Sequence, residues 1–249
     1  MPSRVPSPSK QQLDAIATYT RLLDEAKVRL VGLTDAIDGK MLLPEQLVAD
    51  FCYLELRMLC ELVALGCLVA HGDIEATISS KLQKEYAADS IVKKLEQLHQ
   101  NFYPRPVTVS RTANGHHIER IESGYLSKSE LTALYHSCGD YLHRGSLTKF
   151  RSTAPKRYSA EREKLIQWQR KFVVLLTTHH IASLSNQSHY LCYLSHEQAK
   201  GTPCANMTCD TYPREISEQR GRYDDQPSDK GSDASSAGFF RSRRIARSP

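Results

Sequence analysis

The sequence predicts a mainly α-helical protein: a helical bundle of about five helices, with two small β-hairpin excursions and a disordered C-terminal tail. Apolar side chains recur at steps of three and four over most of residues 10–177. Two short runs rich in β-branched and aromatic residues interrupt that pattern, each around a turn signal. After residue 196 the periodicity ends in a Ser-, Asp-, Gly- and Arg-rich stretch without aliphatic runs. Such a stretch cannot bury enough apolar surface to offset its ordering entropy.

These patterns divide the chain into three parts. Residues 1–9 are polar and rich in Pro and Ser, and we expect them to be disordered. Residues 10–196 are long enough to bury one core and are predicted to form a single helical domain. Residues 197–249 are the predicted disordered tail.

The first two helices follow directly from apolar spacing. The first spans residues 10–37, with apolar positions on one face. Pro44 suits the first turn of a second helix that runs to about Ala70. This second helix is apolar nearly all round, which is typical of the central element of a bundle. Three cysteines lie on it, and as buried small hydrophobes they need no redox role: they are Cys52, Cys60 and Cys67.

A third helix is predicted over about residues 80–99. The prolines of "NFYPRP" end it, because each proline disfavours helical geometry in the residue before it. "VTVSRTANGHHIERI" then predicts a hairpin that turns at Asn114-Gly115. The apolar stripe of the helix comprises Leu82, Tyr86, Val92, Leu95 and Leu98.

The fourth helix has a well-marked start and end. Ser127 and Glu130 form a capping box, and Gly145 stands where a left-handed residue is expected after the helix. A fifth helix is expected over about 159–177, followed by a second hairpin around "SNQS". The fifth helix is expected to bury Leu165, Phe172, Leu176 and Trp168.

Cysteine usage and hydropathy predict a cytoplasmic protein. The seven cysteines form no C-x-x-C pair, and the polar N-terminus contains no apolar signal segment. The most apolar stretch, residues 62–70, is far shorter than the roughly 20 residues that span a bilayer, so no membrane partner is expected. The histidines and cysteines match no metal-site spacing, and we expect no metal and no cofactor.

Positive charge is concentrated directly after the fourth helix. Residues 144–171 hold nine Lys and Arg against Glu161 and Glu163. This basic band is compatible with a solvated helix face and with a polyanionic partner such as RNA. The residues predicted to contact nucleic acid are Arg144, Lys149, Arg151, Lys156 and Arg157.

Three residues are candidates for chemistry. Arg57 and Glu61 are four apart on the apolar second helix, so they can pair; they either reach the surface at a groove or line a polar pocket. His143 ends the fourth helix, where a cation complements the helix dipole. If it shares a pocket with Arg57, its imidazole could instead perform general acid/base catalysis.

Three segments resemble uncharacterised bacterial proteins with HEPN-like helical bundles. They are "YLELRMLCELVALGCL", "NFYPRPV" and "GYLSKSELTALYHSCGDYLHRGS", within roughly residues 40–150. The resemblance implies a metal-independent ribonuclease whose arginine precedes its histidine by four to six residues. His143 takes the histidine position, but positions 136–138 are His136, Ser137 and Cys138. Arg57, oriented by Glu61, is the nearest replacement for the missing arginine.

The leading hypothesis is therefore a helical protein of a bacterial defence, toxin or mobile-element system that binds or cleaves RNA. A homodimer and an antitoxin-like protein partner are expected from the resemblance. The alternative is a non-catalytic helical interaction module that binds a protein partner or a small anion. A third is a chain with no conserved biochemical role.

Overall fold

A computed structural model of the chain describes residues 9–71, 80–112, 115–143, 145, 151, 158–182, 189–194 and 208–209. The chain separates into two units, residues 1–212 and 213–249, and every described residue belongs to the first. The prediction of a mainly α-helical bundle is confirmed within that unit.

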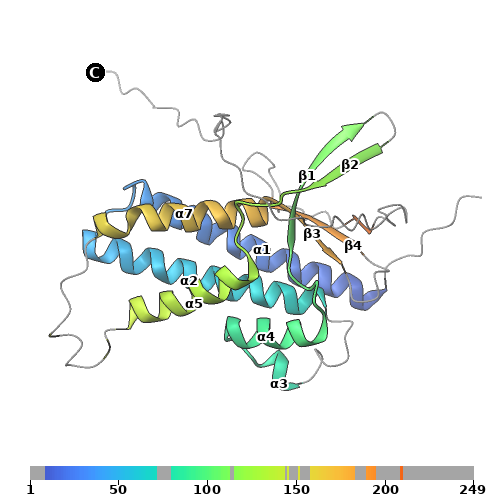
Figure 1. The fold of residues 1–249 in the computed structure, drawn as a ribbon, viewed down its shortest axis with the longest axis horizontal. Coiled ribbons are helices and arrows are strands. Elements are labelled where there is room, and N and C mark those ends of the chain that lie inside the picture. The colour runs from blue at the N-terminus through green and yellow to red at the C-terminus, as the bar shows by residue number, and fades with distance from the viewer. Residues whose placement is uncertain are drawn as a thin grey trace, which may run out of the picture. The chain divides into compact units, whose positions relative to one another are not determined.

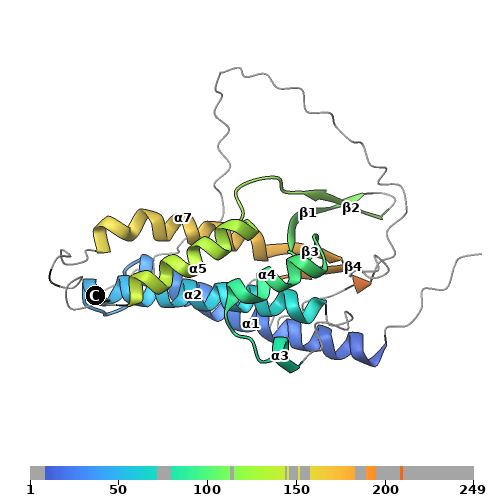
Figure 2. The same cartoon turned by 60° about the horizontal axis from the view of Figure 1, so that its bottom comes forward.

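Four long helices form the body of the first unit: α1 (Lys10–Ile37), α2 (Glu45–Ala70), α5 (Lys128–Leu142) and α7 (Tyr158–Thr177). They run side by side, and the β-strands lie at one end of them (Figure 1). α2 packs against α1, α4, α5 and α7, and Figure 2 shows it among these helices. Its residues Leu56, Leu59 and Ala64 are fully buried. The prediction that the second helix is the central element is therefore confirmed.

The predicted helix over about residues 80–99 is two helices, α3 (Ser80–Gln83) and α4 (Ala88–Leu98). The Glu85 carboxylate accepts the backbone N–H groups of Tyr86 and Ala87, each at 3.0 Å. A side chain that bonds its own neighbouring backbone offers an alternative to the helical hydrogen bonds, which accounts for the break. Tyr86 lies at the break and is exposed, so its assignment to the apolar stripe was wrong.

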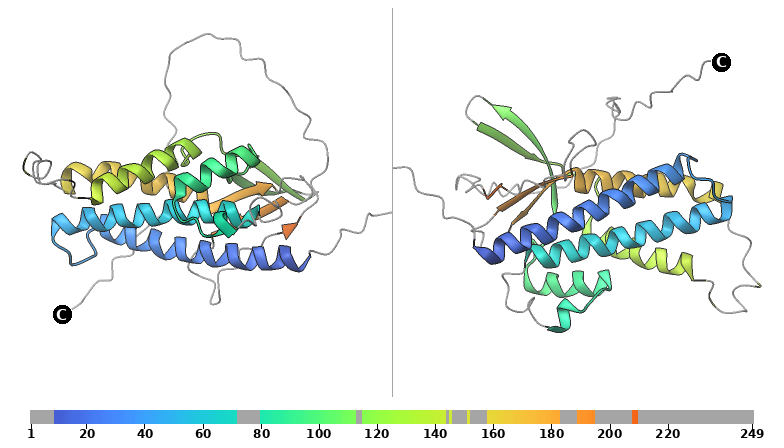
Figure 3. Two further views of the ribbon diagram at one scale, coloured as in Figure 1. Left: turned by 90° about the horizontal axis from the view of Figure 1, so that it is seen from below. Right: turned by 180° about the vertical axis from the view of Figure 1, so that it is seen from behind.

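The two predicted hairpins belong to one antiparallel sheet of strand order β2-β1-β3-β4-β5. The first hairpin is β1 (Arg105–Thr112) with β2 (Gly115–Arg120), and the second is β3 (Thr178–Ala182) with β4 (His189–Tyr193). Arg105 and Pro106 of β1 pair with β3, and the rest of β1 pairs with β2. The β1–β2 hairpin extends away from the helices (Figures 1 and 3).

Two details of the sheet differ from the sequence prediction. The register pairs Thr112 with Gly115, so Gly115 begins a strand instead of occupying the turn; Val109 then lies opposite Ile118. Within the predicted tail, Thr208–Cys209 forms a short strand, β5, that pairs with β4. The remaining residues of 197–249, and residues 1–8, lie outside the described part of the chain.

The boundaries of α5 agree with the sequence prediction. The Ser127 Oγ accepts the Glu130 N–H at 3.3 Å, and the Glu130 carboxylate accepts the Ser127 N–H at 3.0 Å, which completes the capping box. Gly145, after the end of α5, has a φ of 72°. Glycine adopts this left-handed geometry without steric cost, so the predicted left-handed conformation of Gly145 is confirmed.

Candidate functional site

Arg57 and Glu61 meet a third side chain, Tyr135, between α2 and α5. The Arg57 Nε lies 3.5 Å from the Glu61 Oε1, and its Nη2 donates to the Tyr135 Oη at 2.8 Å. The guanidinium also lies over the Tyr135 ring, with 4.1 Å between its Cζ and the ring centroid. The Tyr135 hydroxyl also favours the charged form of the Glu61 carboxylate and so acts to lower its pKa. The three side chains therefore form a polar network centred on Arg57, here called the Arg57 network.

The Arg57 network is partly shielded from water. The Arg57 side chain is 26% exposed and that of Glu61 is 18% exposed. Burial raises the pKa of Glu61, although the Arg57 charge and the Tyr135 hydrogen bond act in the opposite direction. Burial also raises the pKa of Tyr135. The sequence left open whether Arg57 and Glu61 reach the surface at a groove or line a polar pocket. In the structure they lie in a polar junction between α2 and α5 that is partly exposed to solvent.

Gly139 connects the Arg57 network to His143. A Cβ atom added to Gly139 would stand 2.9 Å from the Arg57 Nη1, so the guanidinium occupies the space that a side chain would take. The Gly139 carbonyl accepts the backbone N–H of His143 at 3.0 Å. The Arg57 guanidinium thus lies against the Cα of Gly139, one helical turn before His143, whose backbone N–H bonds the Gly139 carbonyl.

His143 is the C-terminal cap residue of α5, with φ −78° and ψ 128°. Its side chain is exposed. The expected position at the helix end is confirmed. Its backbone has already left the helical conformation at this position.

The residues at 136–138 do not replace the arginine of the resembled motif. His136 is exposed and lies 3.6 Å from the Asp89 carboxylate on α4. Cys138 is fully buried, and burial raises the pKa of its thiol to about 12. Of the five residues predicted to contact nucleic acid, Arg151 is helical and exposed, and the others lie outside the described residues: Arg144, Lys149, Lys156 and Arg157.

Tyr135 and Gly139 were not predicted as members of the site. A glycine inside a helix costs about 0.5–1 kcal/mol relative to alanine, so Gly139 at an interior position signals a close approach of another group. Tyr135 stands four residues before Gly139 on the same helical face. That spacing was visible in the sequence, but nothing in it indicated which helix would pack there.

The described ranges contain neither a metal-binding cluster nor a membrane-spanning helix. No group of three or more His, Cys, Asp or Glu side chains among them is arranged to hold a metal ion. No helix in that part of the chain is long and apolar enough to cross a bilayer.

Comparison with known proteins adds no relative. No protein-family model matches the chain, and no curated protein and no solved structure matches it either.

Proposed function

We propose that this chain binds RNA and cleaves it without a metal ion, using Arg57, Glu61 and His143, as part of a bacterial defence, toxin or mobile-element system. One observation carries the proposal. The Arg57 guanidinium, held by Glu61 and Tyr135, lies on Gly139, whose carbonyl receives the N–H of His143. The resemblance of the sequence to HEPN-like proteins supports the same chemistry.

In this proposal the RNA backbone crosses the α5 surface at Gly139. The His143 imidazole takes the proton of a ribose 2′-hydroxyl, and the 2′-oxygen attacks the adjacent phosphorus. Arg57 stabilises the negative charge that develops on the phosphoryl oxygens. The 5′-oxygen leaves and is protonated by water, so the products are a 2′,3′-cyclic phosphate and a 5′-hydroxyl end. Glu61 and Tyr135 are positioning residues for Arg57.

The direct test is cleavage of a labelled RNA by the full chain in the presence of EDTA. We expect cleavage of RNA, none of the DNA of the same sequence, and a 2′,3′-cyclic phosphate product. Arg57→Ala and His143→Ala should each abolish cleavage, and circular dichroism should show that both remain folded. Cleavage that disappears on EDTA addition, or survives in either variant, would contradict the proposal.

Gly139→Ala offers a sharper probe, because it changes the site without removing a functional group. The added methyl would displace the Arg57 guanidinium, and we expect cleavage to fall on the order of a hundredfold, as for loss of one transition-state donor. Gly32→Ala is the matched control: its Cβ would make ordinary contact with Phe51 at 3.6 Å. If both variants retain wild-type cleavage, Arg57 has no catalytic role.

A second candidate function is a non-catalytic interaction module. Arg57 already contacts a carboxylate, a hydroxyl and an aromatic ring, as expected of a residue that ties two helices together. Leu47 and Leu54 are large exposed apolar residues on the same helix. A second copy or an antitoxin-like protein bound there would bury them. Under this function Arg57→Ala would lower stability, and RNA would remain intact.

A further inference from the structure

A polar pocket of about 160 Å³ lies between the segment that joins α4 to β1 and the start of α5. Its volume exceeds by about tenfold the roughly 10–15 Å³ that one water needs on the same measure. It is smaller than the roughly 300–1,000 Å³ of pockets for drug-sized ligands. The pocket is therefore sized for a small ion or a compact polar group. Its lining residues are Gln100, Asn101, Tyr103, Pro104, Arg105, Tyr125, Ser127 and Lys128.

Both charged side chains that line this pocket are cations, Arg105 and Lys128. The Arg105 Nη2 donates to the Asn101 Oδ1, and the Lys128 Nζ pairs with the carboxylate of Glu96, which is 51% exposed. A guanidinium has five N–H donors and an ammonium has three, so neither group is saturated by that one bond. An exposed ion pair contributes little stability, so the Glu96 contact can be shared with a ligand at small cost.

A bound anion would stabilise the charged guanidinium of Arg105. Burial lowers the pKa of Arg105, and the nearby charge of Arg120 lowers it further, against weaker contributions from Tyr125 and Glu122. A ligand that carries negative charge would offset both the desolvation and the repulsion between the two arginines.

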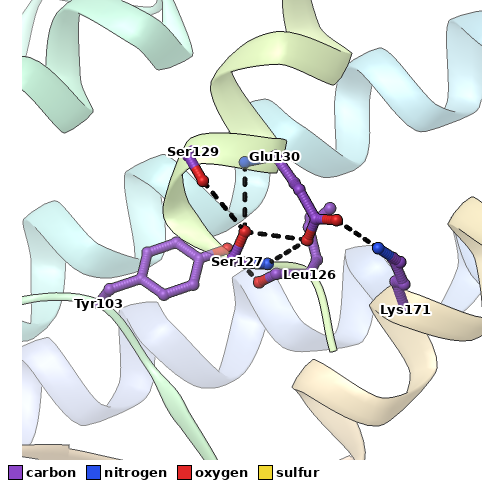
Figure 4. A network of polar contacts seen from close by, with 6 residues as sticks. All are labelled: Tyr103, Leu126, Ser127, Ser129, Glu130 and Lys171. Atoms are coloured by element: carbon purple, nitrogen blue, oxygen red, sulfur yellow. Dashed lines mark hydrogen bonds and ion pairs between the residues drawn. The ribbon is translucent and has the colours of Figure 1, made fainter. Parts of the chain in front are cut away.

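The wall of the pocket is held in place by a hydrogen-bond network (Figure 4). The Tyr103 hydroxyl donates to the Leu126 carbonyl at 2.9 Å, and the Leu126 N–H donates to the Lys171 carbonyl at 3.2 Å. The Glu130 carboxylate bonds Ser127 and the Lys171 ammonium. These bonds connect α5, α7 and the segment before β1, so Tyr103 and Ser127 on the pocket wall are held in place before a ligand binds.

We propose that this pocket binds a phosphate dianion, either inorganic phosphate or the phosphoryl group of a small phosphate monoester, between Arg105 and Lys128. The planar guanidinium matches two phosphoryl oxygens, and the ammonium contributes a second charge. Because electrostatic attraction grows with ligand charge, two neighbouring cations favour a dianion over a singly charged carboxylate, even with the exposed Glu96 carboxylate beside Lys128. The Tyr125 hydroxyl and the amides of Gln100 and Asn101 can donate to the remaining oxygens.

The phosphate site is separate from the proposed general base, His143. Lys128 begins α5, and His143 caps its other end. Fifteen residues of helix span roughly 22 Å, so one small anion cannot contact both. The proposal therefore goes beyond RNA cleavage, and either can fail while the other stands.

The test is titration of the full chain with inorganic phosphate, glycerol phosphate and acetate at constant ionic strength, followed by calorimetry and by NMR of the Arg105 side-chain N–H. We expect saturable binding of inorganic phosphate or of glycerol phosphate, and none of acetate. Equal affinity for the two would identify the phosphoryl group as the recognised unit. Tighter binding of glycerol phosphate would identify a monoester as the ligand.

Three variants test whether phosphate binds in this pocket. Arg105→Gln and Lys128→Gln should each weaken phosphate binding at least about tenfold, which corresponds to 1.4 kcal/mol. Lys94→Gln, which removes an exposed cation of α4 outside the pocket, should bind like the wild type. If Arg105→Gln fails to fold, Lys128→Gln carries the test, because Lys128 is one-third exposed. Absence of saturable binding, or an equal loss in Lys94→Gln, would overturn the proposal.

Discussion

At the scale of single residues, the hydrogen-bond partners of a buried histidine determine which of its ring nitrogens carries the proton. His179 on β3 is fully buried between two partners. Its Nδ1–H donates to the Leu176 carbonyl at 3.2 Å, because a carbonyl can only accept, and its Nε2 therefore accepts from the Tyr19 hydroxyl at 2.7 Å. Tyr19 itself lies against Gly66 of α2, where a Cβ would stand 3.0 Å from its ring. A neutral histidine thus ties the sheet to α1.

We predict an acid-sensitive stability that depends on His179. Burial lowers the pKa of His179 from 6.5 to about 4. Between these values the unfolded chain binds a proton that the folded chain does not, so stability is complete above pH 6.5 and falls toward pH 4. The linked loss is about 3 kcal/mol. Chemical denaturation across this pH range measures it.

The matched variants are His179→Gln and His117→Gln, the second on an exposed residue of β2. His179→Gln should be less stable at pH 7 but should lose less stability on acidification, whereas His117→Gln should follow the wild-type slope. An unchanged slope in His179→Gln would show that another group accounts for the acid sensitivity.

At the scale of elements, the start of α5 joins three parts of the first unit. The capping box satisfies N–H groups of the first turn, and the same Glu130 carboxylate bonds Lys171 of α7. Burial alone would raise the pKa of Glu130, but the Lys171 and Ser127 contacts outweigh it, and the pKa is lowered. The cap thus has an ionic component that reaches a neighbouring helix.

We predict that Ser127→Ala destabilises α5 by about 0.5–2 kcal/mol, the usual cost of a lost N-cap. Amide exchange over residues 128–142 should accelerate from the first turn onward. Since the pKa of Glu130 is lowered in the folded state, the Glu130–Lys171 contribution is present above pH 4.5 and is lost as the pH falls below that value. Unchanged exchange in the first turn of α5 would contradict the assigned cap.

At the scale of the whole molecule, the boundary of the first unit decides which truncations are tolerated. We predict that a chain ending at Tyr212 melts at the temperature of the full chain, because the first unit comprises residues 1–212. A chain ending at His196 should be slightly less stable, because it lacks β5 and exposes the edge of β4. Equal melting of all three chains would show that β5 contributes no stability.

The second whole-molecule prediction concerns charge. If RNA is bound through the basic band, log affinity should fall linearly with log salt concentration, because phosphate contacts release counterions. Changing Lys149, Arg151, Lys156 and Arg157 together to Ala should flatten this slope while leaving the fold intact. Filter binding over a range of salt concentrations measures the slope. RNA affinity that does not respond to salt would exclude the basic band as the contact surface.

Several features of this protein could be predicted from local sequence alone. The spans of α1, α2, α5 and α7, the Ser127–Glu130 capping box and the left-handed Gly145 all follow from periodicity and local backbone chemistry. The pairing of Arg57 with Glu61 follows from their i, i+4 spacing. Each depends on residues within about one helical turn, so local rules are sufficient.

The rest was decided by contacts between distant segments. Local sequence does not specify that β1 pairs with β3 to join two hairpins, that Tyr135 receives Arg57, or that β5 adds to β4. The same holds for the pocket, which Arg105 and Lys128 both line and beside which Tyr103 bonds Leu126 just before α5. Such pairings depend on which apolar faces pack together. Spacing along the chain determines the faces, but only the packed core determines their partners.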